Sequence, residues 1–85
     1  MSAIPVAQLP GVAVERKAPG DRELERYEVM HHNVYVGTVV YVRRRHAAGG
    51  STYGWRPAKA SPNARLDVLA DAIRRLPQLA QQDGA

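Results

Sequence analysis

The chain contains no cysteine, which excludes disulfides, thiolate metal sites and cysteine nucleophiles. No apolar run approaches the roughly 20 residues that a membrane-spanning helix needs, and the first residues lack the basic and long apolar segments of a signal peptide. With 85 residues the chain lies near the lower size limit of independently folding domains, so its core must be thin. We therefore expect a single soluble, cytoplasmic domain without a deep catalytic cleft.

Groups of side chains that would support catalysis or metal binding are also missing. His31 and His32 are adjacent, so on a strand they would point to opposite faces, and His46 lies beyond them, which leaves too few ligands for a structural zinc site. Ser51 and Ser61 are explained by a turn and a helix cap, and no Asp–His pair is spaced to activate either hydroxyl. We expect no enzymatic activity, no cofactor and no bound metal.

The charge of the chain is unevenly distributed. Twelve Lys and Arg residues against eight Asp and Glu residues give a net charge of +4. The excess lies within positions 34–60, which contain no acidic residue and carry Arg43, Arg44, Arg45, Arg56 and Lys59. A localised positive field of this kind attracts a polyanion or an acidic protein surface. The alternative is that the charge only keeps the surface solvated, although arginines scattered along the chain would serve solubility equally well.

The start of the chain is rich in residues that interrupt regular structure, with prolines at positions 5, 10 and 19 and glycines at 11 and 20. We predict a flexible N-terminal arm over residues 1–22, in which the alternation around Val12 and Val14 also allows a short edge strand. The folded domain then covers residues 23–77, and residues 78–85 form a frayed tail.

The middle of the chain has the composition of β-strands. Residues 24–42 are rich in Val and Tyr, and Asn at the break over residues 32–33 tolerates the left-handed conformation of a tight turn. A two-residue turn there would pair Val29 with Val36. A third short strand is predicted over residues 52–56, after a glycine-containing loop.

The last element is a predicted helix. Ser61-Pro62 is a start signal, Pro77 ends or kinks the helix, and helical spacing gives one apolar stripe of Leu66, Leu69, Ala70, Ile73 and Leu76. The predicted fold class is α+β: a three-stranded antiparallel sheet (strand, strand, strand, helix) with one C-terminal helix packed on one face.

The predicted pairing assigns side chains to the two faces of the sheet. Val40, Val42 and Trp55 fall on the face that meets the helix. The opposite face would be uncovered and would carry Arg26, Met30, Tyr35, Val39, Tyr41, Arg43, Arg45 and Arg56. Arginine binds phosphate oxygens and guanine edges, and aromatic rings stack on bases.

Two functions fit this uncovered face. The first is a small nucleic-acid-binding accessory protein, with DNA favoured over RNA, that uses this face and the 43–56 hairpin. The alternative is a protein-binding module, such as an adaptor or an inhibitor encoded by a mobile element, that docks on an acidic partner. Tyr35, Val39 and Tyr41 also suit a self-interface, so we expect a homodimer. The candidate binding residues are Arg26, Tyr35, Tyr41, Arg43, Arg44, Arg45, Arg56 and Lys59.

The order of the elements also suggests a family. Three short strands, the third with Gly54-Trp55, followed by a helix with the sequence Leu69-Ala70-Asp71-Ala72-Ile73, resemble the small arm-site DNA-binding domains of phage and transposon integrases. The resemblance covers residues 24–76 and implies a sheet that lies in the major groove of DNA. It assigns no individual binding residue.

Overall fold

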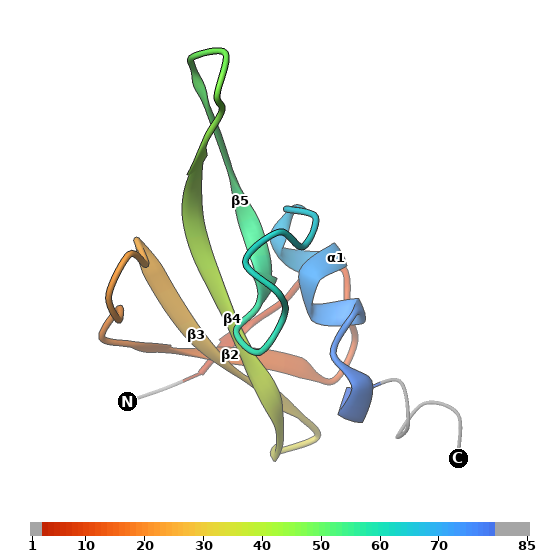
Figure 1. Ribbon diagram of the computed structural model, residues 1–85. Coiled ribbons are helices and arrows are strands. Elements are labelled where there is room, and N and C mark those ends of the chain that lie inside the picture. The colour runs from red at the N-terminus through yellow and green to blue at the C-terminus, as the bar shows by residue number, and fades with distance from the viewer. Residues whose placement is uncertain (1–2, 80–85) are drawn as a thin grey trace.

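The computed structural model describes residues 3–79, which form an antiparallel sheet of five strands in the order β1-β2-β3-β4-β5 (Figure 1). A helical segment of residues 69–79, which is helical at 69–74 and again at 77–79, lies beside the sheet. The elements are β1 (Ile4–Pro5), β2 (Val12–Lys17), β3 (Glu25–His31), β4 (Val34–Arg45), β5 (Ser51–Pro57) and α1 (Leu69–Arg74). β4 has 12 residues and is the longest strand. Its first part pairs with β3 and its second part with β5, so it connects the two halves of the sheet.

The predicted three-stranded α+β fold with a flexible N-terminal arm is wrong, because the segment assigned to the arm supplies β1 and β2. Val12 and Val14 of β2 are buried in the core, and β2 lies between β1 and β3. Pro5 is tolerated because it lies in the edge strand, where a missing amide hydrogen breaks no ladder. Leu79, at the start of the predicted tail, is also buried. Residues 1–2 of the predicted arm and 80–85 of the predicted tail lie outside the described residues.

The hairpin of β3 and β4 has the predicted two-residue turn but a different register. His32 and Asn33 adopt φ values of 51° and 68°, as a tight hairpin turn requires, and Met30 pairs with Tyr35. A β-bulge then shifts the register, so that Val29 lies opposite Gly37 instead of Val36. Because side chains alternate along a strand, one additional residue moves the rest of β4 to the other face.

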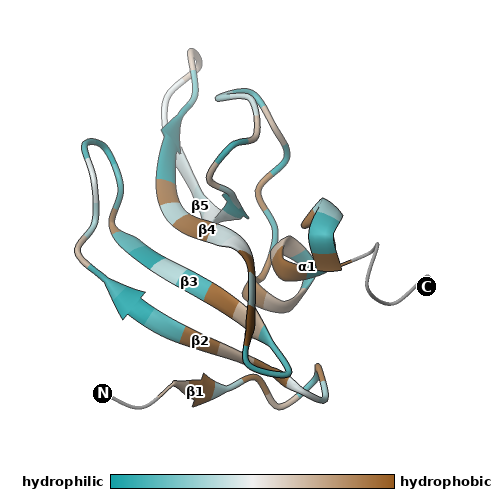
Figure 2. Cartoon of the chain, turned by 90° about the horizontal axis from the view of Figure 1, so that it is seen from below, coloured by the Kyte–Doolittle hydropathy of each residue, from teal (hydrophilic) through white to brown (hydrophobic). Residues whose placement is uncertain are grey.

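The bulge reverses the predicted faces of β4. We call the side of the sheet that α1 covers the helix face, and the other side the loop face. Val39 is fully buried on the helix face, opposite Tyr27, whereas Val40 and Val42 lie on the loop face. The core joins the sheet to the helical segment through Val12, Val14, Val29, Val36, Val39, Ala72, Ile73, Leu76 and Leu79. In Figure 2 the hydrophobic residues of β2 and β3 lie toward the ends of these strands that are nearer α1.

The segment after β5 does not begin a helix at Ser61-Pro62, as predicted, but forms turns over residues 58–64. The hydroxyl oxygen of Ser61 accepts a hydrogen bond from the amide of Asn63 at 3.2 Å, which is a turn contact. Leu66 lies on the loop face, because a Cβ added to Gly54 would be 2.7 Å from the Leu66 Cβ. The segment 58–66 therefore covers part of the loop face, and α1 begins only at Leu69.

Asp67 holds in place the connection between the 58–66 segment and α1. Its main chain forms an isolated bridge with Trp55, with N···O distances of 2.7 and 2.8 Å. Its carboxylate accepts hydrogen bonds from Arg65 and Arg75, both at 2.7 Å. Arg75 thus binds Asp67 and not Asp71, whose carboxylate accepts a hydrogen bond from Arg74 at 2.7 Å. The donation from Arg75 and then from Arg65 holds the pKa of Asp67 below its ordinary value, although desolvation acts in the opposite direction.

We expect Gly54→Ala to destabilise the fold by about 1–3 kcal/mol, the usual cost of forcing an extra methyl group into a packed site. The new Cβ would press on the Leu66 Cβ at 2.7 Å and on the Asp67 main chain at 3.3 Å, and neither can rotate away. Urea denaturation measures the change. Ser51→Ala, at an exposed position of the same strand, is the control and should change the stability by less than about 0.5 kcal/mol. Equal stability of the two variants would contradict the close packing of Leu66 on Gly54.

Acid should weaken the attachment of α1 through Asp67. Because the pKa of Asp67 is lowered by folding, its contribution is present above the ordinary carboxyl pKa and is lost as the pH falls through the lowered value. Asp67→Asn removes this titration. The melting temperatures of wild type and variant should therefore differ at pH 7 and converge in acid. A gap that stays constant with pH would contradict this role.

Candidate functional site

The hairpin of β4 and β5 extends beyond the rest of the sheet (upper part of Figure 1). The pairing of β3 with β4 ends at Tyr41, whereas β4 and β5 remain paired as far as Arg45 and Ser51. Residues 42–54 therefore form a two-stranded ribbon. It is closed by a loop in which the main-chain carbonyl oxygen of His46 accepts a hydrogen bond from the amide of Gly49 at 3.0 Å. Both faces of this ribbon carry arginines of the basic 34–60 segment.

An aromatic row runs along the helix face from the core onto the ribbon. Ring centroids are 5.0 Å apart between Tyr27 and Trp55, 5.2 Å between Trp55 and Tyr41, and 6.3 Å between Tyr41 and Tyr53. The first three residues are partly buried, and Trp55 packs against the core as expected for the helix face, but Tyr53 is 53% exposed. The row thus presents its last ring to solvent.

Two arginines lie beside this exposed ring. Arg43 is the cross-strand neighbour of Tyr53, and Arg45 follows two residues later on the same face. Both are exposed, and neither forms an ion pair or a side-chain hydrogen bond with any residue from 3 to 79. Their guanidinium groups are available to a ligand.

Arg44, between them, has a different environment. It points to the loop face, where its guanidinium donates hydrogen bonds to the carbonyl oxygens of Pro62 and Ala64 at 2.7 and 2.6 Å. These bonds attach the 58–66 segment to the ribbon. Arg44 is therefore a structural residue rather than part of the exposed surface.

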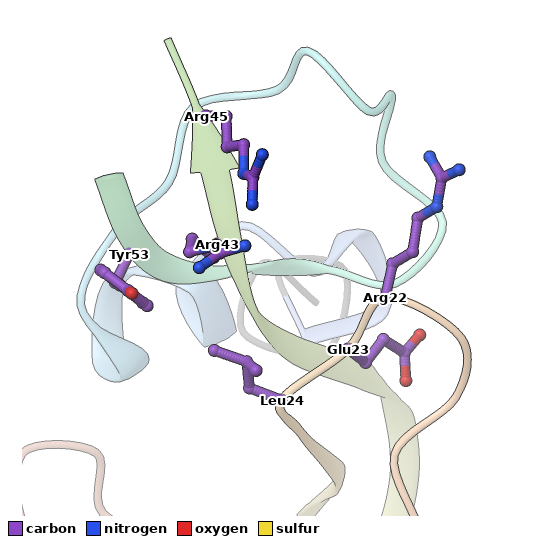
Figure 3. Close-up of a pocket in the computed structure, with 6 residues that line it drawn as sticks. All are labelled: Arg22, Glu23, Leu24, Arg43, Arg45 and Tyr53. Carbon is purple, nitrogen blue, oxygen red and sulfur yellow. The ribbon is translucent and has the colours of Figure 1, made fainter. Parts of the chain in front are cut away.

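An open hollow of about 750 Å³ separates the ribbon from the connection between β2 and β3 (Figure 3). The hollow is lined by Arg22, Glu23, Leu24, Arg43, Arg45 and Tyr53. The connection is held close because the amide of Leu24 donates a hydrogen bond to the carbonyl of Tyr41 at 2.8 Å. Leu24 is 49% exposed, so an apolar surface lies next to the arginines.

Glu23 does not cancel the positive charge of the hollow. Its carboxylate accepts hydrogen bonds from the Gly20 amide at 2.7 Å and from Arg26 at 2.8 and 3.0 Å. Partial burial alone would raise the pKa of Glu23, but the Gly20 amide and the Arg26 guanidinium together hold it below its ordinary value. In Figure 3 the carboxylate points away from Arg43 and Arg45. Because Arg26 neutralises Glu23, three arginines leave the hollow positively charged.

The structure brings together three of the predicted site residues, Tyr41, Arg43 and Arg45, but on the helix face beyond the reach of α1. The other five are separated from them. Arg26 and Arg56 flank Val40 on the loop face, and Arg56 donates to the Pro57 carbonyl at 3.1 Å. The remaining three are Arg44, held by the 58–66 segment, Tyr35, whose hydroxyl lies 2.6 Å from that of Thr38, and Lys59 in the turn after β5.

Sequence reasoning missed Arg22, Leu24 and Tyr53. Tyr53 stands two residues before Trp55 and shares its face, so the spacing signal existed, but the wrong register hid its position beside Arg43. Arg22 and Leu24 carry no local signal, because only the tertiary approach of the β2–β3 connection places them at the ribbon.

Comparisons with known proteins give no match: no family model, curated protein or solved structure resembles the chain significantly. Within residues 3–79 no three His, Asp or Glu side chains are grouped so that they could hold a metal ion. None of the helices described is long and apolar enough to cross a membrane.

We expect the neighbouring arginines to differ in their effect on stability. Arg44→Ala removes two charge-assisted hydrogen bonds to carbonyl oxygens and should cost about 1–2 kcal/mol. Arg43→Ala is the matched control, since it removes the same side chain from an exposed position without a hydrogen-bond or ion-pair partner among residues 3–79. It should change stability by less than about 0.5 kcal/mol. Urea titrations measure both. Equal losses would show that the Arg44 contacts do not hold the 58–66 segment.

Proposed function

We propose that the protein is a small, cytoplasmic, non-enzymatic accessory protein that binds nucleic acid, with DNA as the favoured polymer, through the helix face of the ribbon. The observation that carries this proposal is the exposed Tyr53 beside Arg43 and Arg45, on a hairpin that extends beyond the sheet. Neither arginine has a hydrogen-bond or ion-pair partner among residues 3–79. Guanidinium groups bind phosphate oxygens in a bidentate manner, and aromatic rings stack on bases without regard to sequence.

The distribution of charge supports the same function. All five charged residues of positions 34–60 are basic, and the one acid at the hollow, Glu23, is neutralised by Arg26. A surface of one sign raises the local concentration of a polyanion and accelerates its association. The predicted resemblance to integrase arm-site domains agrees in ligand class and stays a prediction.

A second candidate function is binding to an acidic protein surface. Leu24 and Tyr53 are both about half exposed and line the same hollow as the arginines. Tyrosine and arginine are enriched at the centres of protein interfaces. Homodimerisation was predicted from an exposed patch of Tyr35, Val39 and Tyr41. It stays a prediction, but this patch does not exist, because Val39 is buried under the helical segment.

The dependence of affinity on salt tests the nucleic-acid function. Each arginine that contacts a phosphate should add about 0.9 to the slope of log affinity against log salt for duplex DNA, and about 0.7 for a single strand. The double variant Arg43→Ala/Arg45→Ala should flatten the slope by up to about two units and weaken binding to all sequences. Fluorescence anisotropy at several salt concentrations measures the slope.

The control is Arg16→Ala/Arg74→Ala, which removes the same charge from exposed positions away from the ribbon. If the control flattens the slope as much, net charge rather than the ribbon governs binding. If the wild type binds neither DNA nor RNA at low salt, the nucleic-acid function is rejected and binding to an acidic protein remains.

A further inference from the structure

We infer that the hollow between the ribbon and the β2–β3 connection is a subsite for one unpaired nucleotide of a single strand. The base stacks on Tyr53 as the next ring of the aromatic row, and Arg43 and Arg45 contact the adjacent phosphates. The inference rests on the proposed function and specifies the form of nucleic acid that the protein prefers.

The aromatic row prepares Tyr53 for stacking. Tyr41 supports the Tyr53 ring, with an angle of 26° between the ring planes, and is itself packed against Trp55. Because Tyr53 is 53% exposed, the ring retains a large accessible surface. An aromatic side chain with few rotatable bonds on a paired strand loses little conformational entropy when a base stacks on it.

The positive charges are arranged for a chain of phosphates rather than for one isolated anion. Arg43 and Arg45 are two residues apart on one strand face, which separates their Cα atoms by about 7 Å. Arg22 lies on the opposite side of the hollow (Figure 3). A strand that enters between them therefore meets positive charge on both sides of the base position.

The shape of the hollow favours an unpaired base. Its volume of about 750 Å³ lies within the range of small-ligand sites, and Leu24 supplies an apolar contact for a ring or a sugar. In a duplex both faces of a base are covered by neighbours, and extruding the base costs a few kcal/mol. The protein should therefore bind single strands more tightly than duplexes.

The test is a set of anisotropy titrations of the full chain with labelled oligothymidylate, oligouridylate, a duplex of equal length and an abasic oligomer that keeps the phosphates. We expect the two single strands to bind more tightly than the duplex and the abasic oligomer. Comparison of the thymidylate and uridylate arms shows whether DNA or RNA is preferred, which the shared stacking chemistry does not determine.

Tyr53→Leu should weaken single-strand binding about tenfold or more, within the range measured for loss of one stacked base, and Tyr53→Phe should retain most of it. Tyr35→Leu is the matched control, because Tyr35 is equally exposed at 53% but lies beside the turn that joins β3 and β4, away from the hollow. It should leave the affinity unchanged.

Equal affinity for duplex and single strand, or for the abasic oligomer and the intact strand, would overturn the subsite, as would a Tyr53→Leu variant that binds like wild type. The proposed function would survive those outcomes if the Arg43→Ala/Arg45→Ala variant still flattened the salt slope, and the ribbon would then contact the phosphate backbone without stacking a base. Absence of binding to every oligomer rejects both proposals.

Discussion

The single unpaired residue in the bulge of β4 determines which side chains face α1 and which face the 58–66 segment. Val36 has no cross-strand partner, because Met30 pairs with Tyr35 and Val29 with Gly37. Every later residue of β4 is displaced by one position, so Val39 joins the core. The same displacement puts Tyr41, Arg43 and Arg45 on the helix face. The pairing of Arg43 with Tyr53 then brings the two exposed arginines beside the end of the aromatic row.

The features that could be predicted from the sequence are those with local causes. The turn at His32-Asn33 follows from the tolerance of Asn for positive φ, and the last strand and the apolar positions of α1 follow from composition and spacing. The register of β4 could not be read, because a run with Val36, Val39 and Val40 offers an apolar residue in either parity.

The same distinction applies to β2 and to the candidate site. Prolines and glycines indicated an arm, although the alternation of Val12 and Val14 was the stronger signal, since both become buried. Alternation within one strand placed Arg43 and Arg45 together correctly. Their neighbours Tyr53 and Leu24 depend on cross-strand pairing and on a tertiary hydrogen bond, which no local pattern encodes.

The three consecutive arginines of β4 have different environments. The guanidinium of Arg44 is bound by two carbonyl oxygens of the folded chain, whereas the side chains of Arg43 and Arg45 form no hydrogen bond or ion pair with residues 3–79. Under the proposed function, a homologue without the ligand would be free to lose Arg43 and Arg45 but would retain the arginine between them. Because side chains alternate along a strand, adjacent identical residues can thus serve the fold on one face and a ligand on the other.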